Sequence, residues 1–245
     1  MTRRRWIADE LSGNRAALTG EHAAHLVRVL RARVGQEFDI VADSAIDSPA
    51  SSKVRRGRVT SIADGRVEFD LGEEVPDAVR VDITLALAVF KFDRMEWAIE
   101  KCTELGVSRI VPVIARRTDA HLAAASVARA DRWRRICRQA AEQSRRVALP
   151  EIPAPMKLSQ ALSLAEGLRV VLTESESQTR LRDVLDSATG RSEIALAIGP
   201  EGGWTEDELQ MFQQSGWISA SLGGTILRAE TAAIAATAVV ASLLG

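Results

Sequence analysis

Two glycine-rich turns in the C-terminal third of the chain are the residues best suited to chemistry. The turns at 199–203 (GPEGG) and at Gly223-Gly224 each follow an apolar run short enough to be a buried strand. Glycine adopts positive φ and lets a ligand approach main-chain N–H and C=O groups, because it has no Cβ. Glu201 lies in the first turn, and Arg228 and Glu230 follow the second. We therefore expect both turns at one edge of a sheet, beside a small-molecule pocket.

The start of a helix directly after the first turn supports this interpretation. Thr205 and Glu208 have the spacing of a capping box, which marks a helix N-terminus. A strand, a glycine turn and a helix N-terminus form a pocket in an open α/β sheet, where ligands bind outside the carboxyl ends of the strands. The sequence has no G-x-G-x-x-G and no G-K-[ST], so no motif indicates a dinucleotide or a nucleoside triphosphate. The alternative is that both turns are ordinary strand-to-helix connections.

Alternating strands and helices over residues 81–245 are expected to position these turns. The predicted strands are 81–90, 109–114, 169–173, 194–198 and 218–222. The predicted helices are one capped by Asp93 and Glu96 and stopped by Gly106, then 126–146, 181–185, one capped by Thr205, and 228–244. This alternation predicts an α/β domain, with a parallel sheet covered by helices on both faces.

Residues 1–72 predict a second, smaller and mainly β domain, either a barrel or a sandwich. A helix over about 21–31 precedes predicted strands at 37–41, 55–62 and 66–71, and Asp64-Gly65 is a strong hairpin signal. The acidic segment 73–80, which contains Pro76, predicts a linker between the two domains.

Basic residues gather in two places, although the chain as a whole is close to neutral. Residues 81–150 hold 13 basic and 8 acidic residues, and seven arginines lie between Arg129 and Arg146 against two acids. We expect the face of the long helix that carries Arg132, Arg135 and Arg146 to meet RNA or substrate. In the small domain, the exposed basic residues are expected to be Arg4, Arg28, Arg31, Lys53, Arg55, Arg56 and Arg58, and they could contact phosphates. The alternative for both sets is a solvated surface.

Several other classes of protein are disfavoured by the sequence. No apolar run approaches the roughly 20 residues of a membrane helix, and Ala8-Asp9-Glu10 stands where a signal peptide would be apolar. Cys102 and Cys137 fall on the apolar sides of predicted helices, so we expect reduced core thiols in a cytoplasmic protein. His22 and His25 have no further ligand cluster around them, so we expect no metal site.

Several motifs resemble one known family, and the resemblance runs nearly end to end. GPEGGWTEDEL and LGGTILRAETA, with KFDRMEWAIEKCTELGV and RW..I..QAAEQS.R upstream, look like the RsmE family of ribosomal RNA uridine-N3 methyltransferases of the SPOUT superfamily. Arg4, Trp6 and the stretch from His25 to Gly35 are similar to the PUA-like RNA-binding domain of that family. The paired C-terminal motifs are highly specific at their spacing, and the N-terminal ones are moderately specific.

The resemblance implies a fold, a cofactor and a substrate. The fold would be a PUA-like domain followed by a trefoil-knotted α/β domain, with the segment after Leu222 threaded through an earlier loop. The protein would act as a homodimer on 16S ribosomal RNA within the 30S subunit, with S-adenosylmethionine as cofactor and without a membrane or a metal. By motif position, the cofactor residues would be Leu172, Thr173, Ile198, Gly199, Gly203, Leu222, Gly223, Leu227 and Arg228. The sequence departs from the family at two positions. Thr225 stands where the family usually has a basic residue, and Arg145 stands where it usually has glycine. Both departures bear on which of the family's RNA contacts apply to this sequence.

The chemistry implied is attack of uridine N3 on the methyl sulfonium. Arg228 is the predicted electrostatic clamp for charge on the uracil, because a guanidinium stays protonated. Glu201 or Glu230 is the candidate base. The alternative for Glu230 is an ion pair with Arg228, and for either carboxylate a favourable place at a helix N-terminus. Two other functions stay open: a non-catalytic RNA-binding assembly factor and a methyltransferase that acts on transfer RNA.

Overall fold

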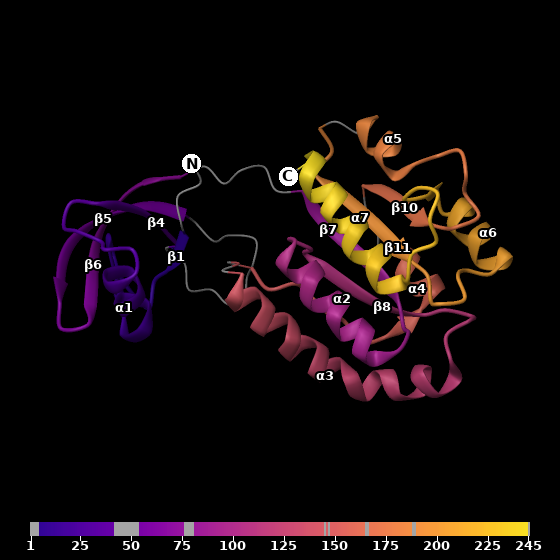
Figure 1. Ribbon diagram of the computed structural model, residues 1–245, viewed down its shortest axis with the longest axis horizontal. Helices are drawn as coiled ribbons and strands as arrows, with labels where there is room; N and C mark the ends of the chain where they lie inside the picture. The colour runs from indigo at the N-terminus through magenta and orange to yellow at the C-terminus, as the bar shows by residue number, and fades with distance from the viewer. Residues whose placement is uncertain are drawn as a thin grey trace. The chain divides into compact units, whose positions relative to one another are not determined.

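The protein divides into two compact units. The computed structural model describes residues 5–41, 54–75, 81–144, 146, 148–164, 167–187 and 190–244. One unit consists of Met1–Ala78 with Arg145–Ala148, and the other of Val79–Ser144 with Leu149–Gly245. Figure 1 labels most of the elements of both units.

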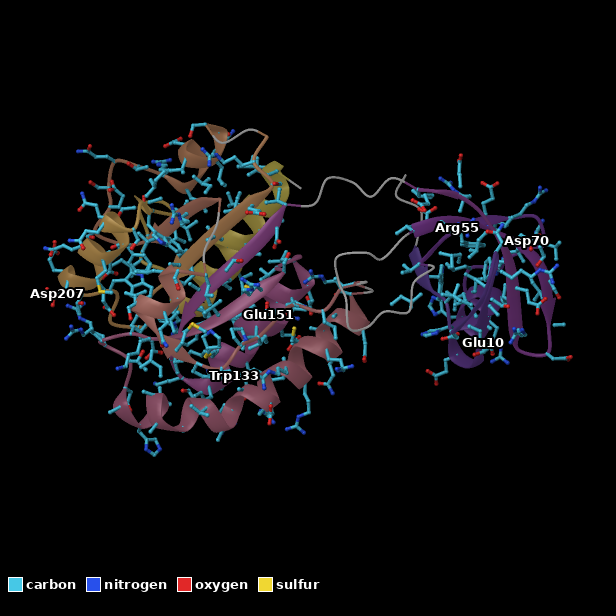
Figure 2. All side chains as sticks on the ribbon, turned by 180° about the vertical axis from the view of Figure 1, so that it is seen from behind. Glu10, Arg55, Asp70, Trp133, Glu151 and Asp207 are labelled. Atoms are coloured by element: carbon cyan, nitrogen blue, oxygen red, sulfur yellow. The ribbon has the colours of Figure 1, made fainter. Side chains whose placement is uncertain are left out.

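In the residues that the structure describes, the first unit is a curled six-stranded sheet with one helix. Its elements are β1 (Arg5–Ile7), β2 (Glu10–Ser12), β3 (Arg15–Thr19), α1 (Gly20–Arg28), β4 (Glu37–Val41), β5 (Val54–Ala63) and β6 (Arg66–Glu74). The strand order is β1-β4-β5-β6-β3-β2, in which β1 and β4 are parallel and the other pairs antiparallel. Trp6, Leu18, Leu26, Phe38 and Phe69 fill its core. Figure 2 locates this unit by the labels Glu10, Arg55 and Asp70.

The hairpin predicted at Asp64-Gly65 is confirmed. Both residues have positive φ, at 50° and 72°, and they join β5 to β6 as a two-residue turn whose twist suits the strands. The sequence reading missed β1, β2 and β3. Gly13-Asn14 between β2 and β3 is itself a hairpin signal, and Gly13 has a φ of 56°. The three-residue strands β1 and β2 contain too few alternations for the hydrophobic pattern alone to reveal them.

The second unit is a parallel sheet between two layers of helices. Its strands are β7 (Asp82–Ala88), β8 (Arg109–Ile114), β9 (Met156–Lys157), β10 (Leu168–Leu172), β11 (Glu193–Ile198) and β12 (Ile218–Ala220). Its helices are α2 (Phe92–Glu104), α3 (Ala120–Gln143), α4 (Leu158–Leu162), α5 (Leu181–Asp186), α6 (Glu206–Gln214) and α7 (Ala229–Leu244). All neighbours in the order β12-β10-β11-β7-β8-β9 run parallel. The expected parallel α/β sheet is confirmed.

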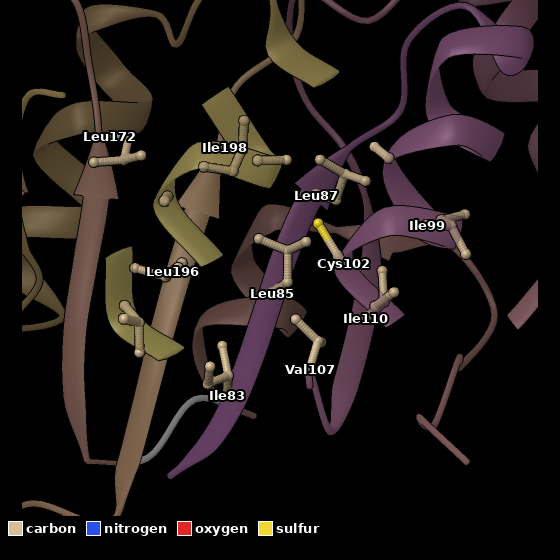
Figure 3. Close-up of a cluster of buried hydrophobic side chains, with 14 of the residues drawn as sticks. Ile83, Leu85, Leu87, Ile99, Cys102, Val107, Ile110, Leu172, Leu196 and Ile198 are labelled. Carbon is tan, nitrogen blue, oxygen red and sulfur yellow. The ribbon is translucent and has the colours of Figure 1, made fainter. Parts of the chain in front are cut away.

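Alternating side chains of the central strands form two cores. Ile83, Leu85 and Leu87 of β7 pack with residues of α2, α3, α5 and α7. Ala86 and Ala88 of the same strand pack with α4 and α6 on the other face. Figure 3 shows the first core between the sheet and two helices. The sheet is therefore covered on both faces, as the sequence predicts, and no described helix is long and apolar enough to span a membrane.

Several helix ends differ from their predictions. Asp93 is not the N-cap of α2, because the helix already begins at Phe92 with Lys91 as N-cap and no side-chain cap bond. Helix α3 begins at Ala120, six residues before the predicted start, because the Asp119 side chain accepts hydrogen bonds from the amides of His121 and Leu122. It ends at Gln143, so Arg146 lies beyond the helix.

The two cysteines are buried thiols, as predicted. Cys102 on α2 and Cys137 on α3 are free and 0% and 2% exposed. Burial raises the pKa of the Cys102 thiol to about 12, because it disfavours the thiolate.

This burial predicts inert cysteines in the folded protein. At a pH of about 8, we expect an aromatic disulfide reagent to label neither thiol on the timescale that labels both in denaturant, because the thiolate is the reactive form. Absorbance of the released thiolate measures the rate. Fast labelling of one thiol in native protein would show an open core.

Candidate active site

The carboxyl ends of three neighbouring strands form the floor of the candidate site. Leu172 ends β10 and pairs with Ile198, the last residue of β11, and with Ala220 at the end of β12. Figure 3 shows Leu172, Ile198 and Leu87 at the same end of their strands. The two glycine turns follow β11 and β12, so the prediction that they share one sheet edge is confirmed.

Tight packing explains the glycines of the first turn. A Cβ on Gly199 would lie 3.2 Å from Trp204 Nε1 and 3.4 Å from the Gly203 carbonyl carbon. Gly203 has a φ of 70°, and its amide donates to Pro200 O at 2.8 Å, which closes the turn. The Thr205 capping box then starts α6 as predicted, with Thr205 Oγ1 accepting from the amide of Glu208 and the Glu208 carboxylate accepting from the amide of Thr205.

The second turn is held beside the segment that follows β10. The Ser221 amide donates to Thr179 O and the Leu181 amide donates to Ser221 O, both at 2.9 Å. Glu176 caps the same segment, and the amides of Thr179 and Gln178 lower the pKa of its carboxyl by stabilising the charged form. The chain after β12 and the chain after β10 therefore form adjoining walls.

A pocket of about 700 Å³ lies between these walls. Its lining includes the nine predicted cofactor residues: Leu172, Thr173, Ile198, Gly199, Gly203, Leu222, Gly223, Leu227 and Arg228. The volume falls in the range of small-molecule sites, and the mixture of aliphatic walls with exposed glycine backbone suits a ligand with an apolar ring and polar edges. Among the described residues, no group of His, Cys, Asp or Glu side chains is placed to hold a metal ion.

Arg94 joins the two candidate bases. Its guanidinium lies 2.5 Å from Glu201 Oε1 and 3.8 Å from Glu230 Oε1. Glu201 lines the pocket, whereas Glu230 is 3% exposed and is not part of the lining. Its Oε2 atom has no hydrogen-bond partner in the described part of the chain. The ion pair expected as the alternative for Glu230 thus forms with Arg94, on α2, and not with Arg228.

Arg228 lies at the junction of the second turn and α7. It is exposed, lines the pocket, and has no hydrogen bond or ion pair from its guanidinium to another described residue. Its carbonyl accepts from the amide of Ala232 at 2.8 Å, so the first turn of α7 fixes its backbone. A fixed backbone with an unpaired guanidinium is the arrangement that an electrostatic clamp needs.

The predicted RNA-binding arginines have different surroundings. Arg132 donates to both oxygens of Glu96, at 2.6 and 2.8 Å. These hydrogen bonds raise the pKa of the Arg132 guanidinium. They also explain why Glu96 does not act as a helix cap. Arg135 is exposed on α3, and Arg146, beyond the helix, is partly buried. Arg28 and Arg31 are exposed in the first unit, and Arg31 has a φ of 53°. Arg4 lies outside the described residues.

Two basic residues expected to be exposed are partly buried instead. Arg55 donates to the carbonyls of Leu71 and Gly72 at 2.8–3.0 Å, and Arg56 lies 3.6 Å from Asp39. Their side chains reach these acceptors because β5 pairs with β6 and β4 on its two sides. The prediction of solvent exposure was wrong for both, and Lys53 lies outside the described residues. Arg58 is exposed.

The sequence reading missed the charged rim of the pocket. Lys91, Arg94, Arg117 and Glu174 all line it. Lys91 and Arg117 follow β7 and β8, and the strand order places β7 between β11 and β8. Lys91 and Glu174 come directly after predicted strands and Arg117 comes three residues after one, and this placement is the signal that could have indicated them.

Gly203 gives a direct test of the backbone argument. We expect Gly203→Ala to weaken binding of S-adenosylmethionine, the cofactor that the resemblance implies, about tenfold, because alanine at this positive φ is strained by about 1–2 kcal/mol and the turn must shift. Gly202→Ala is the matched control, since its φ is not positive and its Cβ would meet only the Arg117 side chain, with Cδ at 3.4 Å and Cβ at 3.7 Å. Calorimetry measures both; equal affinities for the two variants would contradict the argument.

Comparison with known proteins agrees with this geometry. Residues 77–241 match the family model described as RNA methyltransferase domain. The chain is 32% identical over 230 residues to Ribosomal RNA small subunit methyltransferase E of Synechocystis sp., covering 93% of this chain and 73% of that protein.

Two solved structures are similar over nearly the whole chain. One is a Ribosomal RNA small subunit methyltransferase E from Neisseria gonorrhoeae bound to S-adenosyl methionine, with a TM-score of 0.66, 28% identity and coverage of 99% of this chain and 98% of that chain. The other is a putative methyltransferase from Legionella pneumophila in complex with the same cofactor, with a TM-score of 0.64, 27% identity and the same coverage. The chain belongs to the ribosomal RNA small subunit methyltransferase E family of RNA methyltransferases.

Proposed function

We propose that this protein transfers the methyl group of S-adenosylmethionine to N3 of a uridine in 16S ribosomal RNA. The observation that carries the proposal is the pocket at the ends of β10, β11 and β12, whose lining includes the nine residues expected to hold the cofactor. Family membership and the cofactor bound to the relative from Neisseria gonorrhoeae support the same assignment.

The residues present fit this cofactor. Leu172, Ile198, Leu222 and Leu227 offer apolar surface for a purine ring. Gly203 leaves its backbone open, since a Cβ there would meet only Glu174 at 3.9 Å and Arg117 at 4.0 Å, whereas Trp204 packs against Gly199. Main-chain N–H and C=O groups at such turns can read the edges of adenine and the hydroxyls of ribose.

Arg228 performs the main electrostatic step in this proposal. The bound cofactor supplies an electrophilic methyl group on a sulfonium. Loss of the N3 proton to the base would leave negative charge on N3 and on the two flanking carbonyl oxygens, and this charge would be removed as N3 bonds to the methyl group and the methyl–sulfur bond breaks to release the neutral thioether. The Arg228 guanidinium, unpaired within the described chain, donates to this charge without taking a proton. The pocket walls contribute by holding the two reactants in line.

The identity of the base is also a proposal, and its two candidates, Glu201 and Glu230, are not equally well placed. Glu201 lines the pocket but is engaged with Arg94 at 2.5 Å, so it would have to leave this cation before it accepts a proton. Glu230 is buried behind Arg94 and does not line the pocket. Of the two carboxylates, Glu201 is therefore the better placed.

The finer features of the fold are also proposals. The hydrogen bonds of Ser221 with Thr179 and Leu181 bring the chain after β12 beside the segment after β10, which supports a trefoil knot there. The curled sheet of the first unit supports a PUA-like domain over 1–72, with a linker at 73–80 and a methyltransferase domain over 81–245. Trp97 is 50% exposed in a groove between α2 and α3, and an exposed tryptophan of this kind supports a homodimer interface. We place the protein in the cytoplasm, with the 30S subunit as its substrate.

One experiment tests the function and separates it from its rivals. Small ribosomal subunits that lack the modification are incubated with the protein and labelled S-adenosylmethionine, and the methylated base is mapped. We expect one labelled uridine, methylated at N3. Label in transfer RNA would favour the other methyltransferase, and calorimetry without cofactor binding would favour a non-catalytic assembly factor.

A further inference from the structure

The pocket has more cationic side chains than its cofactor can use. Lys91, Arg94, Arg117 and Arg228 line it, together with the carboxylates Glu174, Glu201 and Glu206. Arg94 and Glu201 satisfy each other through their ion pair. Three cations and two carboxylates then remain for ligands.

The charges of S-adenosylmethionine match only part of this set. The cofactor presents two positive groups, the sulfonium and the ammonium, and one carboxylate. The two remaining carboxylates match the two positive groups, and the three cations exceed the single cofactor carboxylate by two positive charges. Arg228 accounts for one of these charges as the clamp on the base, so Lys91 and Arg117 together keep one positive charge for a further anion.

The structure groups the other candidates on one wall of the pocket. Lys91 follows β7 and Arg117 follows β8, and these strands are parallel neighbours. The loops are joined where Thr118 Oγ1 donates to Val89 O at 3.1 Å. Lys91 is also the N-cap residue of α2, a 13-residue helix whose first amides receive no capping side chain. The positive end of that helix adds to the two side-chain charges.

Neither side chain is neutralised by a carboxylate in the described part of the chain. Arg117 donates from Nη1 to Gly202 O at 2.6 Å and to Trp204 O at 3.4 Å, so its partners are neutral carbonyls. These contacts orient Arg117 and leave its other N–H donors available. Lys91 is exposed and has no hydrogen bond or ion pair to another described side chain.

We propose that Lys91 and Arg117 bind a phosphate of the RNA strand beside the target uridine. The inference rests on the proposed function. A base that reacts at N3, on its Watson–Crick edge, has to leave its pair, and a backbone phosphate next to it then lies at the mouth of the pocket. Lysine and arginine fix such a phosphate without reading the sequence, and so place the nucleotide in register.

Salt dependence of the reaction tests this proposal. Lys91→Gln is compared with wild type on small subunits that lack the modification, with labelled cofactor at saturation and salt varied. We expect KM for the subunit to rise about tenfold and the slope of log(kcat/KM) against log[salt] to become shallower by about 0.7–0.9, because one phosphate contact is lost. The dissociation constant for S-adenosylmethionine, measured by calorimetry, stays at its wild-type value.

Lys101→Gln is the matched control, because Lys101 lies on the same helix but pairs with Glu100 and Glu104 and does not line the pocket. We expect it to keep the wild-type salt slope. Arg117→Gln, a second and independent variant, is expected to make the slope shallower as Lys91→Gln does.

Three results separate the possible failures. A Lys91→Gln slope equal to that of Lys101→Gln overturns the phosphate site. Weaker cofactor binding by Lys91→Gln with an unchanged slope assigns Lys91 to the cofactor carboxylate and also overturns it. Failure of the wild-type protein to bind cofactor or to methylate the subunit refutes the proposed function itself, before any variant is compared.

Discussion

Replacing Arg228 by alanine is expected to lower the turnover of methyl transfer about 100- to 1,000-fold, the usual effect of removing one donor to developing charge. The dissociation constant for S-adenosylmethionine is expected to change much less, because the guanidinium acts on charge that appears on the uracil only during the reaction. Single-turnover transfer to small subunits measures the first quantity, and calorimetry measures the second.

The surroundings of Arg228 explain why the effect should be large. Its guanidinium lines the pocket without a carboxylate within 4.0 Å among the described residues, so no internal ion pair weakens its field at the substrate. Glu230, two residues later, is turned towards Arg94 instead. Arg228→Lys keeps the charge but loses the planar fork of donors, and we expect an intermediate turnover.

A surface arginine provides the control for this prediction. Arg182 on α5 has a side chain that is 73% exposed and lies 3.8 Å from Asp186, away from the pocket lining. Arg182→Ala removes the same charge and is expected to keep wild-type turnover. If Arg228→Ala behaved like Arg182→Ala, with cofactor affinity unchanged, the clamp would be wrong.

Short-range patterns were enough to predict the elements that end at the pocket. The apolar runs before Gly199 and Gly223 predicted β11 and β12, and the Thr205–Glu208 spacing predicted the start of α6. Helices and strands of this kind are specified by periodicity and by capping residues within a few positions. The resemblance to a family, and not the periodicity, named the nine residues around the pocket.

Strand order was the information that the pattern could not supply. Arg94 lies 107 positions before Glu201, yet the two side chains form an ion pair because β7 inserts between β11 and β8. No local signal states which strands become neighbours. The same reason explains why Lys91 and Arg117, which follow β7 and β8, were not assigned to the pocket.

The helix boundaries show a local signal that tertiary contacts overrode. Glu96 has the spacing of a cap for Asp93, but its carboxylate binds Arg132 on α3, and α2 begins one residue before Asp93. A bidentate ion pair between two helices is stronger than a cap bond on an exposed first turn. The spacing of Asp93 and Glu96 therefore predicted a helix cap, but in the structure Glu96 joins α2 to α3 through Arg132.

Trp133 is expected to be the side chain whose loss costs the most stability. Trp133, which is labelled in Figure 2, lies on α3, is 0% exposed and belongs to the larger core of the second unit. Its ring meets that of Phe92 edge to face, with the ring centroids 6.0 Å apart. Trp133→Ala should lower the free energy of unfolding by about 3–5 kcal/mol, because it removes a large buried ring and leaves a cavity. Chemical denaturation followed by circular dichroism measures the change.

Trp133→Phe separates packing from hydrogen bonding at this position. The indole Nε1 has no partner in the described part of the chain, so phenylalanine loses volume but no hydrogen bond. We expect a cost well below that of alanine, and equal costs would contradict the packing argument.

The Trp133→Ala variant also links the core to the site. Phe92 is the first residue of α2, directly after Lys91 and two positions before Arg94, so a cavity beneath it loosens one wall of the pocket. Cofactor that binds only the folded protein should raise the free energy of unfolding by about 2.7 kcal/mol at a concentration of 100 times its dissociation constant. If cofactor at equal concentration stabilises Trp133→Ala less than it stabilises the wild type, the variant binds cofactor more weakly. That result would show that cofactor affinity depends on the packing of α2 against the core. Equal stabilisation would mean that the pocket keeps its shape when the packing beneath α2 is lost.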